Sequence, residues 1–109
     1  MLVQNDVIRT ERQWGYFLQF TKNESTTIKL LHIKKGLSTS LQYHHNRSEK
    51  WYVISGKVLA TKGVHSRILE VGNIMIIDKI QRHKLEGLED SIILEISRGL
   101  FDENDIVRL

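Results

Sequence analysis

The apolar residues of this chain occur in short runs separated by polar turn residues, and this spacing constrains the fold more than any other feature. The runs are rich in Ile, Val, Leu and aromatic residues, and they recur at the spacing of about 8–12 residues that is typical of all-β sandwiches and barrels. Helical periodicity appears only in the C-terminal FDENDIVRL, which we expect to form one short helical turn beginning near Asp102 or Asn104. The runs are WGYFLQF, TTIKLLHI, WYVI, KVLAT, ILEV, NIMIID and SIILEI.

The turns between these runs have to be built without proline, because the chain contains none. Lys35-Gly36 is expected to end one strand, and Val71-Gly72-Asn73 is expected to open another. Ser55-Gly56 and Lys62-Gly63 are expected to form tight hairpins. Closing the sheet into a barrel would remove the exposed edges that an apolar β chain otherwise leaves. The predicted fold class is therefore all-β.

Composition excludes several classes of protein. A length of 109 residues suits a single domain, and the absence of cysteine excludes both disulfides and thiolate metal sites. Any bound metal would need imidazole, carboxylate or amide ligands, which suit zinc, iron, manganese or nickel. The net charge of +3 is spread along the chain, and its densest basic segment, 79–84, has no interleaved aromatic residues. We therefore expect no nucleic-acid partner, although a small anion such as a phosphate ester is compatible with this charge.

The sequence has no feature that predicts a membrane or secretory location. No apolar run approaches the ~20 residues that span a bilayer. The N-terminal segment MLVQNDVIRTERQW lacks the apolar core of a signal peptide. The expectation is a cytoplasmic protein without a membrane partner.

One stretch of the chain has the spacing of a metal site. In an extended strand Gln42 and His44 project to the same face, and a turn would bring Glu49 opposite them on an antiparallel neighbour. His83, at the start of another short strand, is the best candidate for a fourth ligand. His45 projects to the opposite face and is not expected to be a ligand. The alternative is a polar hairpin that is rich in histidine and binds no metal.

Two spaced motifs in this chain resemble those of the cupin superfamily. Residues 36–56 follow the spacing Gly, five residues, Gln, one residue, His, four residues, Glu, six residues, Gly, and residues 72–87 contain the second motif. In that second motif Asp78 and Ile80 replace the usual proline and glycine. The segments ERQWGYF, SLQYHHNRSEKWYVISG and DENDIVR are similar to the C-terminal domain of type II mannose-6-phosphate isomerases. That domain also carries Gln in place of the first His.

The resemblance implies a fold, a cofactor and a role for specific residues. It implies a single RmlC-like cupin domain over 1–109, a double-stranded β-helix or jelly-roll barrel, with residues 1–10 as an N-terminal arm. It implies a divalent metal, with zinc preferred, and the following ligands: Gln42, His44, Glu49 and His83. Glu95 and Arg108 are the implied catalytic residues, and Arg47 and Lys84 are candidates for binding a phosphate group.

The implied activity is isomerisation of mannose 6-phosphate to fructose 6-phosphate through an enediolate, in nucleotide-sugar and polysaccharide precursor metabolism. The alternative is a cupin that binds a sugar or nucleotide-sugar without turning it over, or one that acts on a different sugar phosphate. No nucleotidyltransferase segment accompanies the domain, so guanylyl transfer is not expected. By analogy with other small cupins, the chain is expected to form a homodimer.

Overall fold

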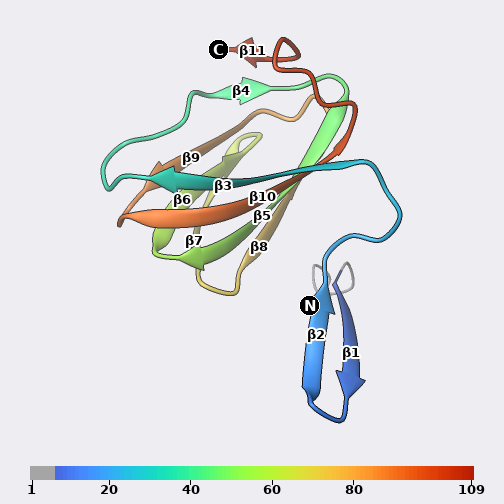
Figure 1. Cartoon of the computed structure of the whole chain (residues 1–109). Coiled ribbons are helices and arrows are strands. Elements are labelled where there is room, and N and C mark those ends of the chain that lie inside the picture. The colour runs from blue at the N-terminus through green and yellow to red at the C-terminus, as the bar shows by residue number, and fades with distance from the viewer. Residues whose placement is uncertain (1–6) are drawn as a thin grey trace.

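Every regular element of the described chain is a strand. The computed structural model describes residues 7–109, which form eleven strands (Figure 1). The seven apolar runs fall in β2, β3, β5, β6, β7, β8 and β10, which confirms the all-β prediction. The strands are β1 (Ile8–Arg12), β2 (Gly15–Gln19), β3 (Thr26–Ile33), β4 (Gln42–Tyr43), β5 (Arg47–Ser55), β6 (Lys57–Lys62), β7 (His65–Glu70), β8 (Ile74–Ile77), β9 (His83–Gly87), β10 (Ser91–Gly99) and β11 (Val107–Arg108).

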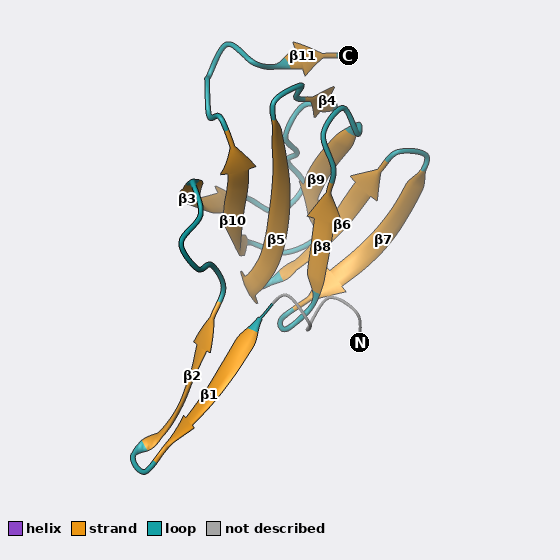
Figure 2. Cartoon of the chain, turned by 90° about the vertical axis from the view of Figure 1, so that its right-hand side faces the viewer, coloured by secondary structure: helices purple, strands orange, loops and turns teal. Residues whose placement is uncertain are grey.

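Two sheets pack face to face to make the barrel. One sheet has the strand order β3-β10-β5-β8, and the other has the order β11-β4-β9-β6-β7 (Figure 2). The main core draws on both, with Trp51 and Ile93 from the first sheet and Val58, Leu69 and Leu85 from the second, all at most 1% exposed. Burying a large apolar side chain contributes about 1.5–3 kcal/mol. The β1–β2 hairpin pairs with neither sheet and projects away from the barrel.

The inner face of the barrel changes character along its strands. On β5 the alternating inward residues begin with Arg47 and Glu49 and continue with Trp51 and Val53, all of them buried. The antiparallel β10 runs in the matching direction, because Ser97 lies opposite Glu49 and Ile93 lies opposite Val53. On β9 the inward residues change in the same way, from the buried His83 to the buried Leu85. One end of the interior is therefore an apolar core, and the other end is a polar pocket.

Two local predictions were wrong. Ser55-Gly56 is not a hairpin, because β5 and β6 belong to different sheets and this dipeptide carries the chain from one to the other. Lys62-Gly63 does join a hairpin, between β6 and β7.

The C-terminal segment forms no helical turn. The N–H of Asp105 donates to the carbonyl of Asp102 in a reverse turn, and the chain then pairs as β11 with β4. One isolated turn of helix is unfavourable, whereas the edge of β4 offers unpaired backbone groups.

The N-terminal part of the chain differs from a simple arm. Of the predicted arm, residues 1–6 lie outside the described residues, and residue 8 already begins β1. The hairpin that follows was not anticipated from the sequence beyond the run in β2. Within residues 7–109 there is no helix of the length and hydropathy needed to cross a bilayer.

A pair of glycine substitutions tests how tightly the two sheets are joined. Gly56 has a φ of +86°, and a Cβ there would lie 2.8 Å from Cα of Ser91 and closer still to its hydroxyl. Gly63 also has a positive φ, of +62°, but a Cβ at Gly63 would have no heavy atom within 4 Å beyond its chain neighbours. Gly63→Ala should therefore cost only the backbone penalty of about 1–2 kcal/mol, and Gly56→Ala should cost clearly more. Urea unfolding of the two variants measures the difference, and equal losses would contradict the crowding at Gly56.

Candidate metal centre

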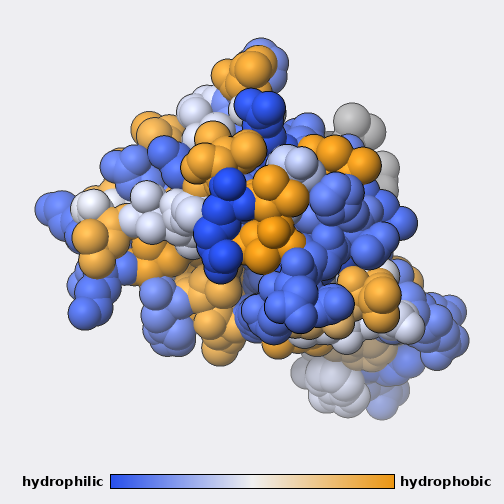
Figure 3. Space-filling model, turned by 90° about the horizontal axis from the view of Figure 1, so that it is seen from above, coloured by the Kyte–Doolittle hydropathy of each residue, from blue (hydrophilic) through white to orange (hydrophobic). Residues whose placement is uncertain are grey.

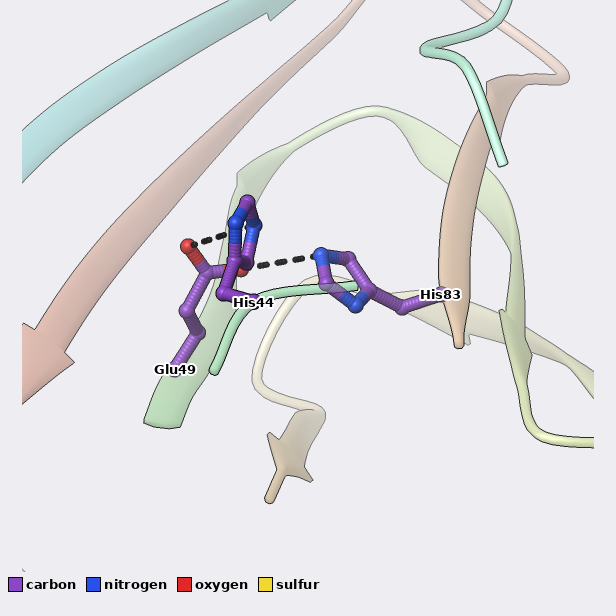
Figure 4. Close-up of side chains that lie close together, drawn as sticks. All are labelled: His44, Glu49 and His83. Atoms are coloured by element: carbon purple, nitrogen blue, oxygen red, sulfur yellow. Dashed lines mark ion pairs between the residues drawn. The ribbon is translucent and has the colours of Figure 1, made fainter. Parts of the chain in front are cut away.

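Three buried side chains converge at the polar end of the barrel. His44, Glu49 and His83 are 4%, 3% and 2% exposed, and their ligand atoms all lie within 4.8 Å of one another (Figure 4). His83 Nε2 is 3.3 Å from Glu49 Oε1, and His44 Nε2 is 3.8 Å from Glu49 Oε2. Figure 4 shows both imidazole rings turned towards the Glu49 carboxylate. Two imidazoles and a carboxylate in this arrangement could hold a metal ion.

The two sheets supply these residues from opposite sides of the interior. His44 follows β4, and His83 begins β9 in the five-stranded sheet, whereas Glu49 lies on β5 in the four-stranded sheet. The expected antiparallel pairing of Glu49 with the strand of Gln42 and His44 was therefore wrong. Glu49 instead faces His44 across the barrel, because residues 45–46 carry the chain to the other sheet. Gln42 lies directly opposite His83 in the β4–β9 pair and lines the same cavity.

Backbone carbonyls fix the orientation of both histidines. Nδ1 of His44 lies 2.7 Å from the carbonyl oxygen of Asp105, and Nδ1 of His83 lies 2.8 Å from that of Gln81. A carbonyl oxygen only accepts, so each Nδ1 carries the proton and donates it. In the neutral rings the lone pair is then on Nε2, which faces Glu49. This is the tautomer in which Nε2 binds a metal while Nδ1 is held by a second group.

The residues of the site fit a cation. Within the described part of the chain, Glu49 Oε1 and His83 Nε2 are buried and have no hydrogen-bond partner. A buried polar group that is left unpaired costs about 1–3 kcal/mol, and a metal ion between the two atoms would remove that cost. Imidazole nitrogen with carboxylate and amide oxygen suits zinc, iron, manganese and nickel.

The electrostatics of the site favour the protonation states that a metal requires. Burial lowers the pKa of His44, which keeps its ring neutral. Burial alone would raise the pKa of Glu49, but His83, His44 and Arg47 outweigh it and lower that pKa below its usual value. A neutral imidazole beside an ionised carboxylate is the state in which these groups ligate.

Glu95 lines the same cavity beside this group. Its side chain is 8% exposed and its Oε2 accepts a hydrogen bond of 3.1 Å from Nε1 of Trp51. Burial, followed by the negative charge of Glu49, raises the pKa of Glu95 to about 7. The cavity has a volume of about 200 Å³ and contains two inward cations, Lys29 and Arg47. A carboxyl group that titrates near neutral pH can act as a proton acceptor and donor.

Arg47 lies deeper than the sequence suggested. A residue that binds the phosphate of a substrate is expected near the cavity mouth, but Arg47 is 6% exposed, its Nε donates to Glu49 Oε2 at 3.4 Å, and its Nη2 donates to His44 Nε2 at 3.3 Å. It faces inward because it occupies the same alternating positions of β5 as Glu49. Its guanidinium also lies 4.3 Å from the centre of the Phe101 ring.

The C-terminal segment closes over this end of the barrel. The carboxylate of Asp105 accepts hydrogen bonds from the backbone N–H groups of His45 and Asn46, at 2.8 and 2.9 Å. Lys29 pairs with Glu103 at 3.3 Å and lies over the ring of Phe101. Figure 3 shows the molecule from above, from the end that carries β4 and β11. Hydrophilic and hydrophobic side chains are interspersed on this surface.

Two of the predicted site residues do not line the cavity. Lys84 follows the inward His83 on β9 and therefore points to the outer face, opposite Thr61. Arg108 lies opposite Gln42 in the β11–β4 pair, but its side chain is exposed. Sequence reasoning missed Lys29 and Asp105. β3 has apolar residues on both faces, so its sequence pattern did not indicate that Lys29 faces the interior. Asp105 contacts mainly backbone groups about 60 residues earlier in the chain, which no local pattern indicates.

Solved structures place this architecture among the cupins. The epimerase RmlC of Mycobacterium tuberculosis matches 95% of the chain and 66% of its own chain, with a TM-score of 0.70 and 11% identity. At that identity the likeness shows the fold alone, and the expected RmlC-like cupin barrel is confirmed. A putative sugar phosphate isomerase from Acidithiobacillus ferrooxidans matches 69% of the chain and 51% of its own, with a TM-score of 0.63 and 25% identity.

Sequence comparison adds relatives that are much longer. Mannose-1-phosphate guanylyltransferase 2 of Escherichia coli O157:H7 is 32% identical over 100 residues, which is 89% of this chain. The chain spans only 21% of that relative's length. The family model described as mannose-6-phosphate isomerase C-terminal matches residues 3–109. Because that match takes in nearly the whole sequence, the chain belongs to the mannose-6-phosphate isomerase C-terminal family.

Proposed function

We propose that this chain is a metal-dependent sugar-phosphate isomerase domain that interconverts mannose 6-phosphate and fructose 6-phosphate. The observation that carries the proposal is the placement of Glu95, a buried carboxyl group with a pKa of about 7, in one cavity with the His44–Glu49–His83 group. Membership of the mannose-6-phosphate isomerase C-terminal family supports it. The cavity is below the ~300–1,000 Å³ of sites for drug-sized ligands, which suits a small polar substrate.

The proposed reaction moves one proton between neighbouring carbons. Glu95 removes the proton from C2 of the aldose, and the electron pair moves towards O1 to give an enediolate. Glu95 then returns the proton to C1, while the hydroxyl proton passes from O2 to O1 to leave the ketose. A divalent metal held by Gln42, His44, Glu49 and His83 would polarise the sugar oxygens as a Lewis acid. Trp51 orients the Glu95 carboxyl through its indole N–H.

The cations of the cavity are the proposed partners of the phosphate group. Arg47 and Lys29 both line the cavity and both lie against the Phe101 ring, at 4.3 and 4.4 Å from its centre, so two positive charges are brought near one another. A guanidinium can bind phosphate oxygens in a bidentate manner. Lys84 and Arg108 are given no role here, because neither lines the cavity.

A second candidate function is binding of a sugar or nucleotide-sugar without turnover. It is favoured by the exposed position of Arg108, which leaves Glu95 as the one member of the predicted catalytic pair inside the cavity. It is also favoured by the name of the longer relative from Escherichia coli O157:H7, which is a mannose-1-phosphate guanylyltransferase. The activity assay below separates the two candidates.

Metal binding should depend on the converging histidines. Protein stripped with a chelator is expected to bind one Zn²⁺ per chain in calorimetric titration, and His83→Ala should weaken that binding at least about 100-fold because a ligand is lost. His65→Ala is the control, since His65 is an exposed histidine on β7 outside the cavity. If both variants bind zinc as the wild type does, the site is not a metal centre.

Isomerase activity should depend on Glu95. With metal present, Glu95→Gln should lower kcat for mannose 6-phosphate by about 10²–10⁴-fold, because the amide cannot accept the proton. A coupled assay of fructose 6-phosphate formation measures this, with Glu70→Gln as the control because Glu70 is exposed on β7. Chelator should abolish the reaction. A wild-type protein that binds metal and mannose 6-phosphate but forms no product would favour the binding function.

The raised pKa of Glu95 also predicts how stability changes with pH. The folded state holds this proton up to about pH 7, whereas the unfolded chain releases it near the ordinary value of 4.5. At a pH between 4.5 and about 7, folding therefore takes up a proton at Glu95, and the free energy of unfolding falls as the pH rises through this range. In chelator, the wild type should lose about 2–3 kcal/mol relative to Glu95→Gln between pH 5 and pH 8. Urea unfolding at the two pH values measures this, and a pH-independent difference would refute the raised pKa.

A further inference from the structure

The loop of residues 100–106 forms one side of the cavity mouth. It connects β10 to β11 above the barrel (Figure 1), and its Glu103 and Ile106 line the cavity. Lys29, on β3 of the four-stranded sheet, lines the same cavity. Its Nζ pairs with Glu103 Oε1 at 3.3 Å, and the two side chains are 39% and 77% exposed. This ion pair therefore lies where the cavity meets solvent.

The ammonium group and the loop are both held by contacts other than this ion pair. Nζ of Lys29 lies 4.4 Å from the centre of the Phe101 ring, and the buried Arg47 lies against the same ring at 4.3 Å. Near its other end the loop is fixed by the Asp105 carboxylate, which accepts two backbone N–H hydrogen bonds. An exposed ion pair contributes little to stability. The Lys29–Glu103 pair is therefore not needed to keep either group in place.

The position of Lys29 suits the phosphate group of a bound sugar phosphate. Lys29 lies directly opposite Glu95 in the β3–β10 pair, and both residues line the cavity. A phosphate ester bound to Lys29 at the mouth would extend its sugar inward, towards Glu95 and the metal-binding group. The carboxylate of Glu103 already contacts the ammonium that this phosphate would bind. Glu103 and the ligand therefore compete for one cation.

We propose that Glu103 is a built-in competitor for the phosphate group of the substrate, and that it makes the cavity specific for phosphate monoesters. This inference rests on the proposed sugar-phosphate site. An anion that binds Lys29 has to displace the Glu103 carboxylate, so it must attract the ammonium more strongly than one negative charge does. A phosphate monoester carries about −1.5 to −2 charges at pH 7, and its attraction to the ammonium is correspondingly larger. A neutral sugar gains nothing from Lys29.

The competing role and a purely structural role of Glu103 predict effects of opposite sign. If Glu103 competes, Glu103→Gln frees the ammonium and should tighten binding of a phosphate ester about two- to fivefold, which is the range of an exposed ion pair. If Glu103 only holds the loop, the same substitution loosens one side of the mouth, and binding weakens or stays the same. Asp102→Asn is the matched control, because it removes an equal charge from the same loop at an exposed position outside the cavity.

Nuclear magnetic resonance titration of metal-free protein in chelator measures these affinities without turnover. The ligands are mannose 6-phosphate and glycerol phosphate, and mannose is the neutral reference. Lys29→Met should weaken binding of both esters at least about tenfold, because a charge-assisted hydrogen bond is lost. On the Lys29→Met background, Glu103→Gln should have no further effect. The affinity for mannose should be the same in all variants.

Tighter ester binding in Glu103→Gln, but not in Asp102→Asn or on the Lys29→Met background, would support the competing role. Weaker or unchanged binding in Glu103→Gln, or a wild type that binds neither ester, would overturn it. Circular dichroism melting identifies a variant that has failed to fold, and if that variant is Lys29→Met, the comparison of Glu103→Gln with Asp102→Asn decides. Because the titration involves no turnover, absence of isomerase activity would refute the proposed reaction without changing this result.

Discussion

The structure depends on a change along the inner faces of β5, β9 and β10, which are apolar at one end of the barrel interior and polar at the other. At one end Trp51, Leu85 and Ile93 fill the space between the sheets. At the other end the same strands present Glu49, His83 and Glu95, which are also buried. A buried carboxylate is costly unless it is paired. Burial of the apolar side chains of each strand offsets the free-energy cost of burying the polar side chains at its other end.

The polar half is organised before any ligand arrives. Carbonyl groups of Gln81 and Asp105 hold the two imidazoles so that their Nε2 atoms face the carboxylate. The C-terminal segment therefore does more than cover the barrel, because it supplies one of these carbonyls and also anchors the turn after His44 through the Asp105 carboxylate. Fixing ligands in this way lowers the reorganisation that binding requires.

Much of the fold was predictable from the sequence, because a short apolar run between polar turn residues has few alternatives to a strand. The four residues suggested as metal ligands do lie together, although Glu49 reaches the others from the opposite sheet rather than from a paired strand. What failed depends on long-range contacts. The C-terminal tail pairs with β4, far earlier in the chain, instead of forming a helical turn. Lys84 is an exception, because the alternation of a strand already places it on the face opposite to its neighbour His83.

The guanidinium of Arg47 has a consequence for the order of assembly. It contacts both the carboxylate of Glu49 and the Nε2 atom of His44, so it occupies part of the space that an ion would take. The negative charge of Glu49 is thereby compensated in the absence of an ion, and the barrel can close without a metal. Binding of a metal at this group would then be an exchange of one positive charge for another, which a fully folded protein can carry out.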